Sequence, residues 1–247
     1  MKIFAVYNIK GGVGKTTTSV NLAYLSAAEG AQTLIWDLDP QASTTFYFCI
    51  EPKIRGGVKR MLTGDADFDR LLRMTGYPNL DLLPSDITYR EMDQIVADQN
   101  RKNKVLEKML KPLSRRYDHL ILDCPPGLTM VAESVFGLAD VLLVPLIPTT
   151  LSLRAYNNLV QFLIKNNFRK LKVLPFFTMV SESKPIHRAV TRNIFEKYPI
   201  FLKSQIPDST VIEAMGVKRS PVFPYARQSP EADAYRQLWQ EIKERCA

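Results

Sequence analysis

The sequence predicts an α/β fold with a single doubly wound, mostly parallel sheet and helices on both faces. Three observations lead to this prediction. Short apolar, β-prone runs alternate with segments of helical periodicity along most of the chain. The first two runs enclose a glycine-rich loop and a helix, which is the order of a βαβ unit. The 247 residues, of which 46% are hydrophobic, are enough to bury the core of one domain.

The opening βαβ pattern is the first part of this fold. The run KIFAVYN, which starts at residue 2, predicts a strand that ends where the glycines begin. Residues 16–30 predict a helix, because TTTSVNLAYLSAAEG repeats apolar residues at helical spacing and stops at Gly30, a natural C-cap. QTLIWDLD predicts the second strand, and the rule of right-handed crossovers makes the two strands parallel.

The later elements continue the alternation. Apolar runs predict further strands over residues 119–125, 141–147 and 172–180. Periodicity predicts helices over about residues 102–114, 152–165, 185–197 and 230–245. Residues 51–90 contain turn-forming residues and predict irregular connections with short helices. No repeat or linker interrupts the chain, so we expect one domain over residues 1–247.

The helix expected over about residues 230–245 predicts packing rather than membrane binding. Tyr235, Leu238, Trp239 and Ile242 form an apolar stripe with acids and bases mixed around it. A membrane anchor of the same kind is the alternative, and it carries a basic polar face. The sequence predicts neither a spanning helix nor a signal peptide. We therefore expect a cytoplasmic protein without stable membrane association.

Charge is distributed unevenly along the chain. Residues 1–150 contain 17 basic and 17 acidic residues, whereas residues 151–247 contain 16 basic and 8 acidic residues and so carry the whole net charge of +8. The basic portion, about residues 150–220, favours a polyanionic partner, and a merely solubilising surface is the alternative. The scattered cysteines have no metal-ligand spacing and indicate reduced thiols. They are Cys49, Cys124 and Cys246.

A glycine-rich segment, NIKGGVGKTTT, follows the first strand. Its glycines let backbone N–H groups approach phosphate oxygens at the positive end of the next helix, as in a P-loop. We expect Lys15 to bridge terminal phosphates and Thr16 to offer its hydroxyl to Mg²⁺. A glycine-rich turn without a ligand is the alternative. The expected nucleotide contacts in this segment are Lys10, Gly11, Gly12, Val13, Gly14, Lys15, Thr16 and Thr17.

Two acidic positions are expected beside the phosphate loop. Asp123 ends the apolar run LILDCPP, where an aspartate holds a Mg²⁺-bound water in Walker B sites. Asp37 and Asp39 end the second strand, so they point to opposite faces, or Asp39 already lies in the loop. We expect all three to serve the metal site, Asp37 as outer support and Asp39 by orienting the attacking water. A turn residue before Pro40 is the alternative for Asp39.

The loop contains one lysine more than a phosphate site needs. The usual pattern has glycine at the position of Ile9, and here Lys10 follows that residue. Lys10 lies outside the span that wraps phosphate, so it is available to the nucleotide of a neighbouring subunit. A cation placed there would neutralise charge as an arginine finger does, an effect worth roughly 10³–10⁵ in rate. A solvated surface lysine is the alternative.

These motifs together resemble one family. KGGVGKTT, WDLDPQAS and LILDCPP are similar to the deviant Walker A ATPases of the ParA/MinD group, and particularly to the ParA/Soj branch. The resemblance continues to the tail that starts IPDSTVIEAMG. It implies a P-loop NTPase that forms a homodimer around two ATP molecules with Mg²⁺. It further implies that Lys10 reaches the partner's γ-phosphate and that Asp39 is the hydrolytic residue. Adenine would lie near Pro207 and Asp208.

Non-specific double-stranded DNA is the expected polyanion. Nine bases fall between residues 165 and 203, against two acids. Arg188 and Arg192 are four residues apart and share a helix face, and Lys218 and Arg219 lie in a later loop. No base-reading motif is apparent, so phosphate contact without sequence choice is expected. Relatives often carry arginine at the position of Asp208, so we expect the DNA face to depend mainly on Arg188, Arg192 and Arg219.

The sequence therefore predicts an ATP-dependent positioning switch. The resemblance implies an ATP-bound homodimer that holds the nucleoid and is released when a ParB-like or other cargo adaptor stimulates hydrolysis. The cargo would be a plasmid, a chromosome or a protein cluster. A MinD-like membrane-associated ATPase is one alternative. A small-molecule ATP-dependent ligase of the dethiobiotin synthase type is the other.

Overall fold

A computed structural model describes residues 1–54, 56–63, 68–98 and 104–246. Its described residues form one sheet with the strand order β3-β4-β2-β5-β1-β6-β7-β8. Neighbouring strands run parallel, except that β3 is antiparallel to β4. The strands are β1 (Lys2–Val6), β2 (Thr33–Asp37), β3 (Arg73–Met74), β4 (Leu80–Leu83), β5 (His119–Asp123), β6 (Val141–Leu146), β7 (Lys172–Val180) and β8 (Gln205–Pro207).

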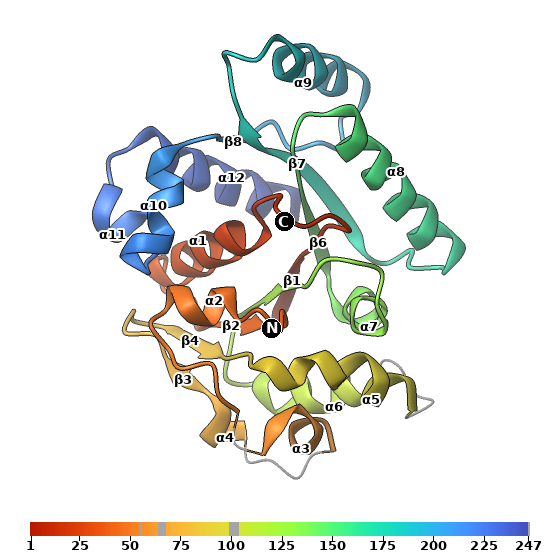
Figure 1. The fold of residues 1–247 in the computed structure, drawn as a ribbon, viewed down its shortest axis with the longest axis vertical. Helices are drawn as coiled ribbons and strands as arrows, with labels where there is room; N and C mark the ends of the chain where they lie inside the picture. The colour runs from red at the N-terminus through yellow and green to blue at the C-terminus, as the bar shows by residue number, and fades with distance from the viewer. Residues whose placement is uncertain (55, 64–67, 99–103, 247) are drawn as a thin grey trace.

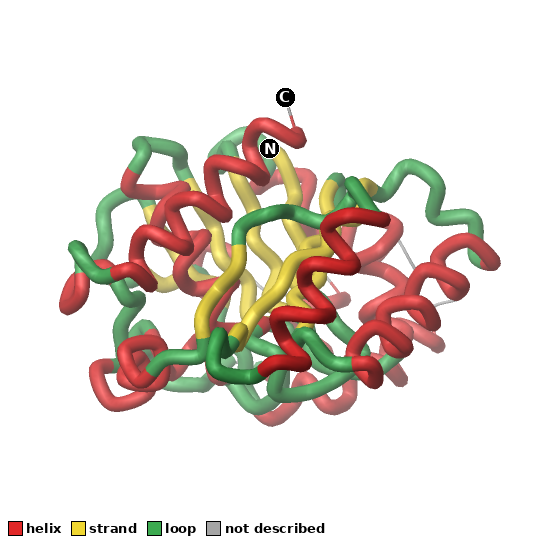
Figure 2. The backbone as a smooth tube through the Cα atoms, turned by 90° about the horizontal axis from the view of Figure 1, so that it is seen from above, coloured by secondary structure: helices red, strands yellow, loops and turns green. Residues whose placement is uncertain are grey.

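Helices cover both faces of this sheet (Figures 1 and 2). They are α1 (Lys15–Ala28), α2 (Ser43–Tyr47), α3 (Gly57–Thr63), α4 (Phe68–Leu71), α5 (Met92–Asp98), α6 (Lys104–Leu113), α7 (Met130–Leu138), α8 (Thr150–Lys165), α9 (Pro185–Lys197), α10 (Thr210–Lys218), α11 (Phe223–Ala226) and α12 (Pro230–Cys246), with a 3₁₀ helix at Ile87–Glu91. The prediction of a doubly wound, mostly parallel α/β fold is confirmed.

Strand alternation separates the core into two apolar layers. Phe4 and Val6 point to the side of α1, α10 and α12. Ala5 points to the opposite side, where α5, α6, α7 and α8 pack. Successive side chains of a strand alternate between faces, so a central strand that is buried on both sides is apolar throughout. This is why the strands of the sequence read as continuous apolar runs.

The C-terminal helix α12 packs its apolar stripe against the first layer. Tyr235, Leu238, Trp239 and Ile242 are each 1% exposed or less. The indole of Trp239 meets Phe4 edge-on at 5.6 Å and donates a hydrogen bond to Glu29 Oε2 at 3.0 Å. The apolar stripe of α12 is thus buried against the rest of the protein. No helix of the described residues is both long and apolar enough to cross a bilayer.

The sequence prediction was incomplete between residues 51 and 98. Short helices are present there, as expected, but β3 and β4 are also present and were not predicted. β4 has only four residues, LDLL, and its identity as a strand comes from parallel pairing with β2. α5, α7 and α10 were also missed. Of the helix expected over about residues 102–114, residues 102 and 103 lie outside the described part of the chain.

Candidate nucleotide site

The glycine-rich loop lies at the point where the strand order reverses. β1 is central, with β5 on one side and β6 on the other, and the loop connects its carboxyl end to α1. Asp123 pairs in register with Val6 and also with Asp37. The ends of β1, β2 and β5 are therefore level, and both carboxylates lie beside the loop. Ligands of doubly wound folds bind at such a switch point.

The loop conformation requires glycine at two positions. Gly12 has φ 69° and Gly14 has φ 79°, in the left-handed region that disfavours residues with a side chain. A Cβ on Gly14 would also lie 3.3 Å from Thr17 Oγ1. The loop is braced from β7, because Thr178 Oγ1 donates to the carbonyl oxygen of Val13 at 2.9 Å. Gly11 and Gly12 are exposed.

No side chain of a described residue caps the N-terminus of α1. Its N-cap residue, Gly14, makes no side-chain cap hydrogen bond, and the first turn contains no acidic residue. The first N–H groups of a helix need acceptors, and they carry the positive end of the helix dipole. An uncapped start behind a glycine loop fits a phosphate group.

The two lysines of the loop have different environments. Lys15 is 7% exposed, and its Nζ donates to the carbonyl oxygen of Lys10 at 3.0 Å. Burial lowers the pKa of Lys15, while the nearby charges of Asp123 and Asp39 oppose that shift. The backbone N–H of Lys10 is bound to Asn8 Oδ1 at 2.9 Å. Its ammonium has no hydrogen bond or ion pair to any described residue. Hydrogen bonds therefore hold the backbone of Lys10, while its ammonium is unpaired among the described residues.

Asp123 is held by hydroxyl groups from two helices. It is 1% exposed, and it accepts hydrogen bonds from Ser19 Oγ at 3.1 Å and Thr44 Oγ1 at 2.8 Å. Burial raises the pKa of Asp123, and the hydroxyls of Thr44, Thr16 and Ser19 together with the charge of Lys15 act against that shift. Thr44 is the second residue of α2, so the hydrogen bonds of Asp123 connect α1 to the segment that follows β2.

Asp37, like Asp123, is buried, but it accepts hydrogen bonds from a different set of residues. Its Oδ2 accepts from the N–H and the hydroxyl of Thr45 at 2.8 and 2.7 Å, and its Oδ1 accepts from the N–H of Asp39 at 3.2 Å. Burial is the largest cause of the raised pKa of Asp37, and the charge of Asp123 adds to it. Asp39 lies beyond the strand in the loop and is only half-buried, with Oδ1 accepting from Gln41 N at 2.9 Å.

The carboxylate and hydroxyl oxygens of this site suit Mg²⁺ that arrives bound to a nucleotide. The described residues contain no group of three or more His, Cys, Asp or Glu that could hold a metal ion. Mg²⁺ prefers oxygen ligands and is usually bound by one or two carboxylates together with substrate phosphates. Two crowded carboxylates with raised pKa values beside a phosphate loop, and the hydroxyl of Thr16, fit that mode.

Thr44 and Thr45 are functional-site residues that the sequence reasoning missed. Each donates a hydroxyl to one of the two buried carboxylates. The signal was present in the run DPQASTT, where hydroxyl residues follow the acidic pair. It could not be read without the fold, because the contact from Thr44 to Asp123 spans 79 residues.

Pro207 and Asp208 lie on the same edge of the sheet as the loop. Pro207 ends β8, and the N–H of Asp208 donates to the carbonyl oxygen of Val180 at 2.9 Å. Two strands, β6 and β7, separate β8 from β1. The carboxylate of Asp208 forms an exposed ion pair with Lys184 at 3.7 Å. The adenine contact expected at these residues stays a prediction.

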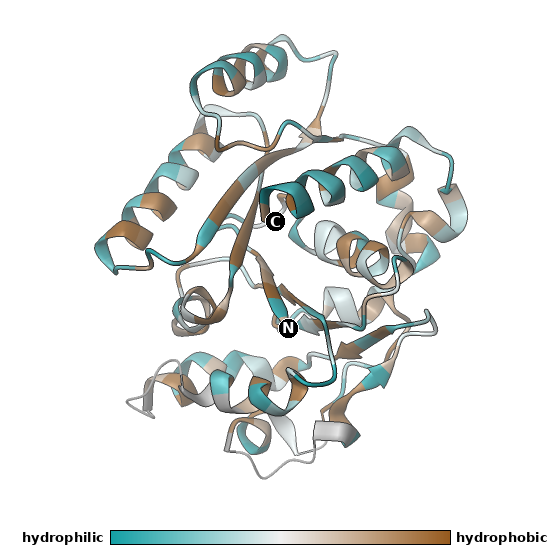
Figure 3. Cartoon of the chain, turned by 180° about the vertical axis from the view of Figure 1, so that it is seen from behind, coloured by the Kyte–Doolittle hydropathy of each residue, from teal (hydrophilic) through white to brown (hydrophobic). Residues whose placement is uncertain are grey.

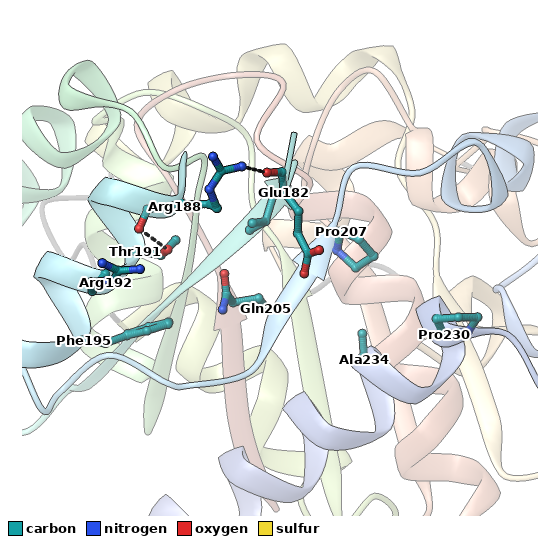
Figure 4. Close-up of a pocket in the computed structure, with 10 residues that line it drawn as sticks. Glu182, Arg188, Thr191, Arg192, Phe195, Gln205, Pro207, Pro230 and Ala234 are labelled. Carbon is teal, nitrogen blue, oxygen red and sulfur yellow. Dashed lines mark hydrogen bonds between the residues drawn. The ribbon is translucent and has the colours of Figure 1, made fainter. Parts of the chain in front are cut away.

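Arg188 and Arg192 lie on one exposed face of α9. They line a surface hollow of about 670 Å³ together with Thr191, Phe195 and Gln205 (Figure 4). Arg188 donates a hydrogen bond to the carbonyl oxygen of Glu182, which places its guanidinium at the rim (Figure 4).

The other two predicted DNA residues, expected in a loop, lie where α10 ends: Lys218 is its last residue and Arg219 follows it directly. Lys218 is exposed. Arg219 stacks over the ring of Phe46 at 4.5 Å and donates to its carbonyl oxygen at 3.1 Å. Arg219 therefore fastens α10 to α2, and the four residues do not form one helix surface.

The switch-point loop and the acidic edge beside it define a nucleotide-binding α/β protein of the P-loop class. Residues 1–173 match the AAA_31 family, described as an AAA domain. The chain belongs to this family of ParA/MinD-type ATPases.

Individual relatives support this membership. The chain is 34% identical to the sporulation initiation inhibitor protein Soj of Bacillus subtilis over 58% of its length and 57% of that protein. It is similar to an ATP complex of McdA from Cyanothece, with 25% identity, a TM-score of 0.81, and coverage of 99% and 95%. It is also similar to cobyrinic acid a,c-diamide synthase of Mycobacterium smegmatis with an ATP analogue and magnesium, with 27% identity, a TM-score of 0.82, and coverage of 97% and 93%.

Proposed function

We propose that the protein is a ParA-like positioning ATPase. ATP and Mg²⁺ bind at the glycine loop, two subunits close around two nucleotides, and the dimer holds double-stranded DNA without sequence choice. A ParB-like or other adaptor then stimulates hydrolysis, and the dimer releases the DNA. The cargo is a plasmid, a chromosome or a protein cluster. The protein is cytoplasmic and associates with the nucleoid in its ATP state.

The free ammonium of Lys10 is the observation that carries this proposal. Lys15 is buried over the loop, where it can serve the nucleotide of its own subunit. Lys10 has its backbone pinned on both sides, by Asn8 and by Lys15, and its charge is uncommitted among the described residues. A pinned backbone holds a cation at the mouth of the site, where a second subunit would present its terminal phosphate. ATP binding then becomes a signal for dimerisation.

The remaining residues of the site take complementary roles in this proposal. Thr16 offers its hydroxyl to Mg²⁺, which when bound neutralises charge on the phosphates. Asp123 orients the water around that ion, and Thr44 fixes the carboxylate that does so. Asp39, in the loop and half-exposed, is placed to orient the attacking water. Asp37 supports this arrangement because its carboxylate accepts a hydrogen bond from the N–H of Asp39.

The DNA contact is assigned to exposed bases of α9 and α10. Arg188, Arg192 and Lys218 are exposed, and residues 151–247 carry the whole net charge of +8. Phosphate contacts without base readout give weak, salt-dependent binding. A dimer doubles the number of contacts on one rigid body, so ATP-driven dimerisation raises avidity without any new residue. Arg219 contributes mainly through its packing on α2.

The test is fluorescence anisotropy of a labelled random-sequence duplex with ADP, ATP or a non-hydrolysable analogue at two salt concentrations. We expect binding only in the ATP state, weakened steeply by salt and lost in the double variant Arg188→Ala/Arg192→Ala. Lys111→Ala, an exposed base on α6, is the matched control and should bind like the wild type. Binding that is equal with ADP and ATP would refute the switch, and no binding in any state would remove DNA from the proposal.

A small-molecule ligase is the second candidate, favoured by the likeness to cobyrinic acid a,c-diamide synthase. The two candidates differ in what their ATP turnover requires. A positioning ATPase hydrolyses ATP faster with DNA and an adaptor. A ligase hydrolyses ATP only with a carboxylate substrate and an amine donor, and it is indifferent to DNA. Steady-state ADP release with and without duplex DNA separates them.

A further inference from the structure

A second hollow lies beside α8, away from the nucleotide loop. It has a volume of about 280 Å³ and is almost entirely apolar. Its lining residues are Tyr156, Val160, Leu163, Ile164, Phe168, Arg169, Leu171, Val173 and Ile200. Leu163 and Leu171 are buried at 5% and 8% exposure, whereas Ile164 and Ile200 are 65% and 44% exposed. Large apolar side chains are thus exposed around the rim of the hollow, and buried apolar side chains form its recessed floor.

The hollow faces the edge of the sheet opposite the phosphate loop. α8 starts at Thr150, close after the carboxyl end of β6, and returns to Lys165 beside the start of β7. The lining comes from α8, from the connection between α8 and β7, from the amino end of β7, and from Ile200 in the connection between α9 and β8. β6, β7 and β8 are parallel, so their amino ends share that opposite edge. Figures 1 and 3 show α8 along the flank of the sheet, with hydrophobic residues on its turns. An occupant here leaves the nucleotide loop open.

The surroundings of this hollow are basic. Residues 141–181 contain five bases and no Asp or Glu. Arg169 lines the hollow, and Lys165 and Lys170 adjoin lining residues along the chain. All three are exposed, and their charged groups form no hydrogen bond or ion pair with any described residue. Lys172 is committed through its Nζ, which donates to the carbonyl oxygen of Arg245. An apolar centre with uncommitted bases at one rim is complementary to an apolar side chain beside carboxylates.

The size and shape of the hollow select the class of occupant. Small-molecule sites usually span about 300–1,000 Å³ and hold several converging polar groups. This hollow, at about 280 Å³ with one hydroxyl and one guanidinium in its lining, is at the lower limit and lacks such groups. It does fit one or two large side chains of a partner, which is how interface anchors bind. Insertion into a bilayer needs protruding apolar residues, whereas this floor is recessed.

We propose that this hollow docks a segment of a partner protein in which a large aliphatic or aromatic side chain is flanked by carboxylates. The apolar side chain enters between α8 and β7, and the carboxylates meet Lys165, Arg169 and Lys170. This docking site goes beyond the proposed function and does not depend on it. Docking at this edge is compatible with both nucleotide states.

The test is selection of a random linear peptide display library on the full-length protein, with the Ile164→Glu variant as counter-selection. Ile164 is 65% exposed, so the substitution is expected to leave the fold intact. Enriched peptides should combine Leu, Ile, Phe or Trp with Asp or Glu. One such peptide is then synthesised, labelled and titrated by anisotropy. Its affinity should fall about tenfold or more in Ile164→Glu and several-fold in Arg169→Glu, as for central and rim contacts.

Ile87→Glu is the matched control, because Ile87 is 57% exposed in the 3₁₀ helix near the other end of the sheet. It should bind the peptide like the wild type, and ADP and ATP should give equal affinities. No enrichment, enriched peptides without carboxylates, or binding insensitive to Ile164→Glu would overturn the proposal. So would binding of phosphatidylglycerol vesicles, or self-association in light scattering, that Ile164→Glu abolishes. Failure of the duplex assay alone refutes the DNA proposal and leaves this one standing.

Discussion

Burial of Asp37 should make the stability of the nucleotide-free protein depend on pH, and Asp37→Asn should remove that dependence. The pKa of Asp37 is raised from its ordinary value of 3.8, first by burial and then by the charge of Asp123. The folded carboxyl therefore keeps a proton that the unfolded chain has released. Its contribution to stability is fully present below pH ~4 and is lost as the pH rises toward the raised pKa of the folded state.

The size of the effect follows from one proton. In the window between the two pKa values, stability falls by about 1.4 kcal/mol per pH unit, or about 3 kcal/mol from pH 5 to pH 7. Asparagine keeps an oxygen for both Thr45 donors but places its NH₂ against the N–H of Asp39, whose 3.2 Å bond is the longest of the three. Losing that bond costs about 1 kcal/mol. Asp37→Asn should thus be less stable than the wild type at pH 4 and more stable at pH 7, and the two stabilities should be equal at about pH 4.5.

Urea unfolding of both proteins at pH 4, 5.5 and 7 without nucleotide measures this crossover. The other titrating groups are common to both proteins, so the difference in unfolding free energy isolates Asp37 and its influence on Asp123. Asp233→Asn, at an exposed ion pair on α12, is the control for removing a surface carboxylate, and it should not become more stable than the wild type at any of the three pH values. A constant difference between wild type and Asp37→Asn across the three pH values would show that Asp37 is ionised in the fold and would refute the reasoning.

The other predictions concern the loop and its neighbours. Lys10→Ala should still bind ATP, but it should not dimerise in light scattering, and ATP turnover should fall by roughly 10³ or more; a dimeric, fully active variant would exclude the role in trans. Gly14→Ala should lose nucleotide binding and about 1–2 kcal/mol of stability, because φ is 79° and the new Cβ meets Thr17 at 3.3 Å; wild-type binding in calorimetry would contradict this. Thr44→Val should lower ATP turnover with little change in ATP affinity, and an unchanged turnover number would show that its hydrogen bond to Asp123 is dispensable. Arg219→Ala should lower the free energy of unfolding by about 1 kcal/mol and weaken the free energy of DNA binding by less; the reverse order would make it a DNA contact.

The sequence predicted the central strands and the phosphate loop because their signals are local. β1, β2, β5, β6 and β7 are apolar runs that end near glycine, aspartate or proline, and each was expected within a few residues of its bounds. The glycine loop follows from backbone conformations that few other residues adopt. Short elements escaped prediction because β3, β4 and β8 have two to four residues, too few for periodicity to identify.

By itself, the sequence determined the fold class, the loop, its two lysines and the acidic residues beside them. The loop, Asp37 and Asp39 belong to one βαβ unit, and Asp123 ends a further parallel strand, so the carboxyl ends of these strands bring them to one edge of the sheet. Only the tertiary structure decided which hydroxyls hold the carboxylates, since Ser19 and Thr44 reach Asp123 across 104 and 79 residues. It also decided that the ammonium of Lys15 is buried and bonded to a carbonyl oxygen, while that of Lys10 has no partner among the residues that the structure describes. Contacts of this kind depend on the register between strands and on helix packing, and no local pattern encodes either.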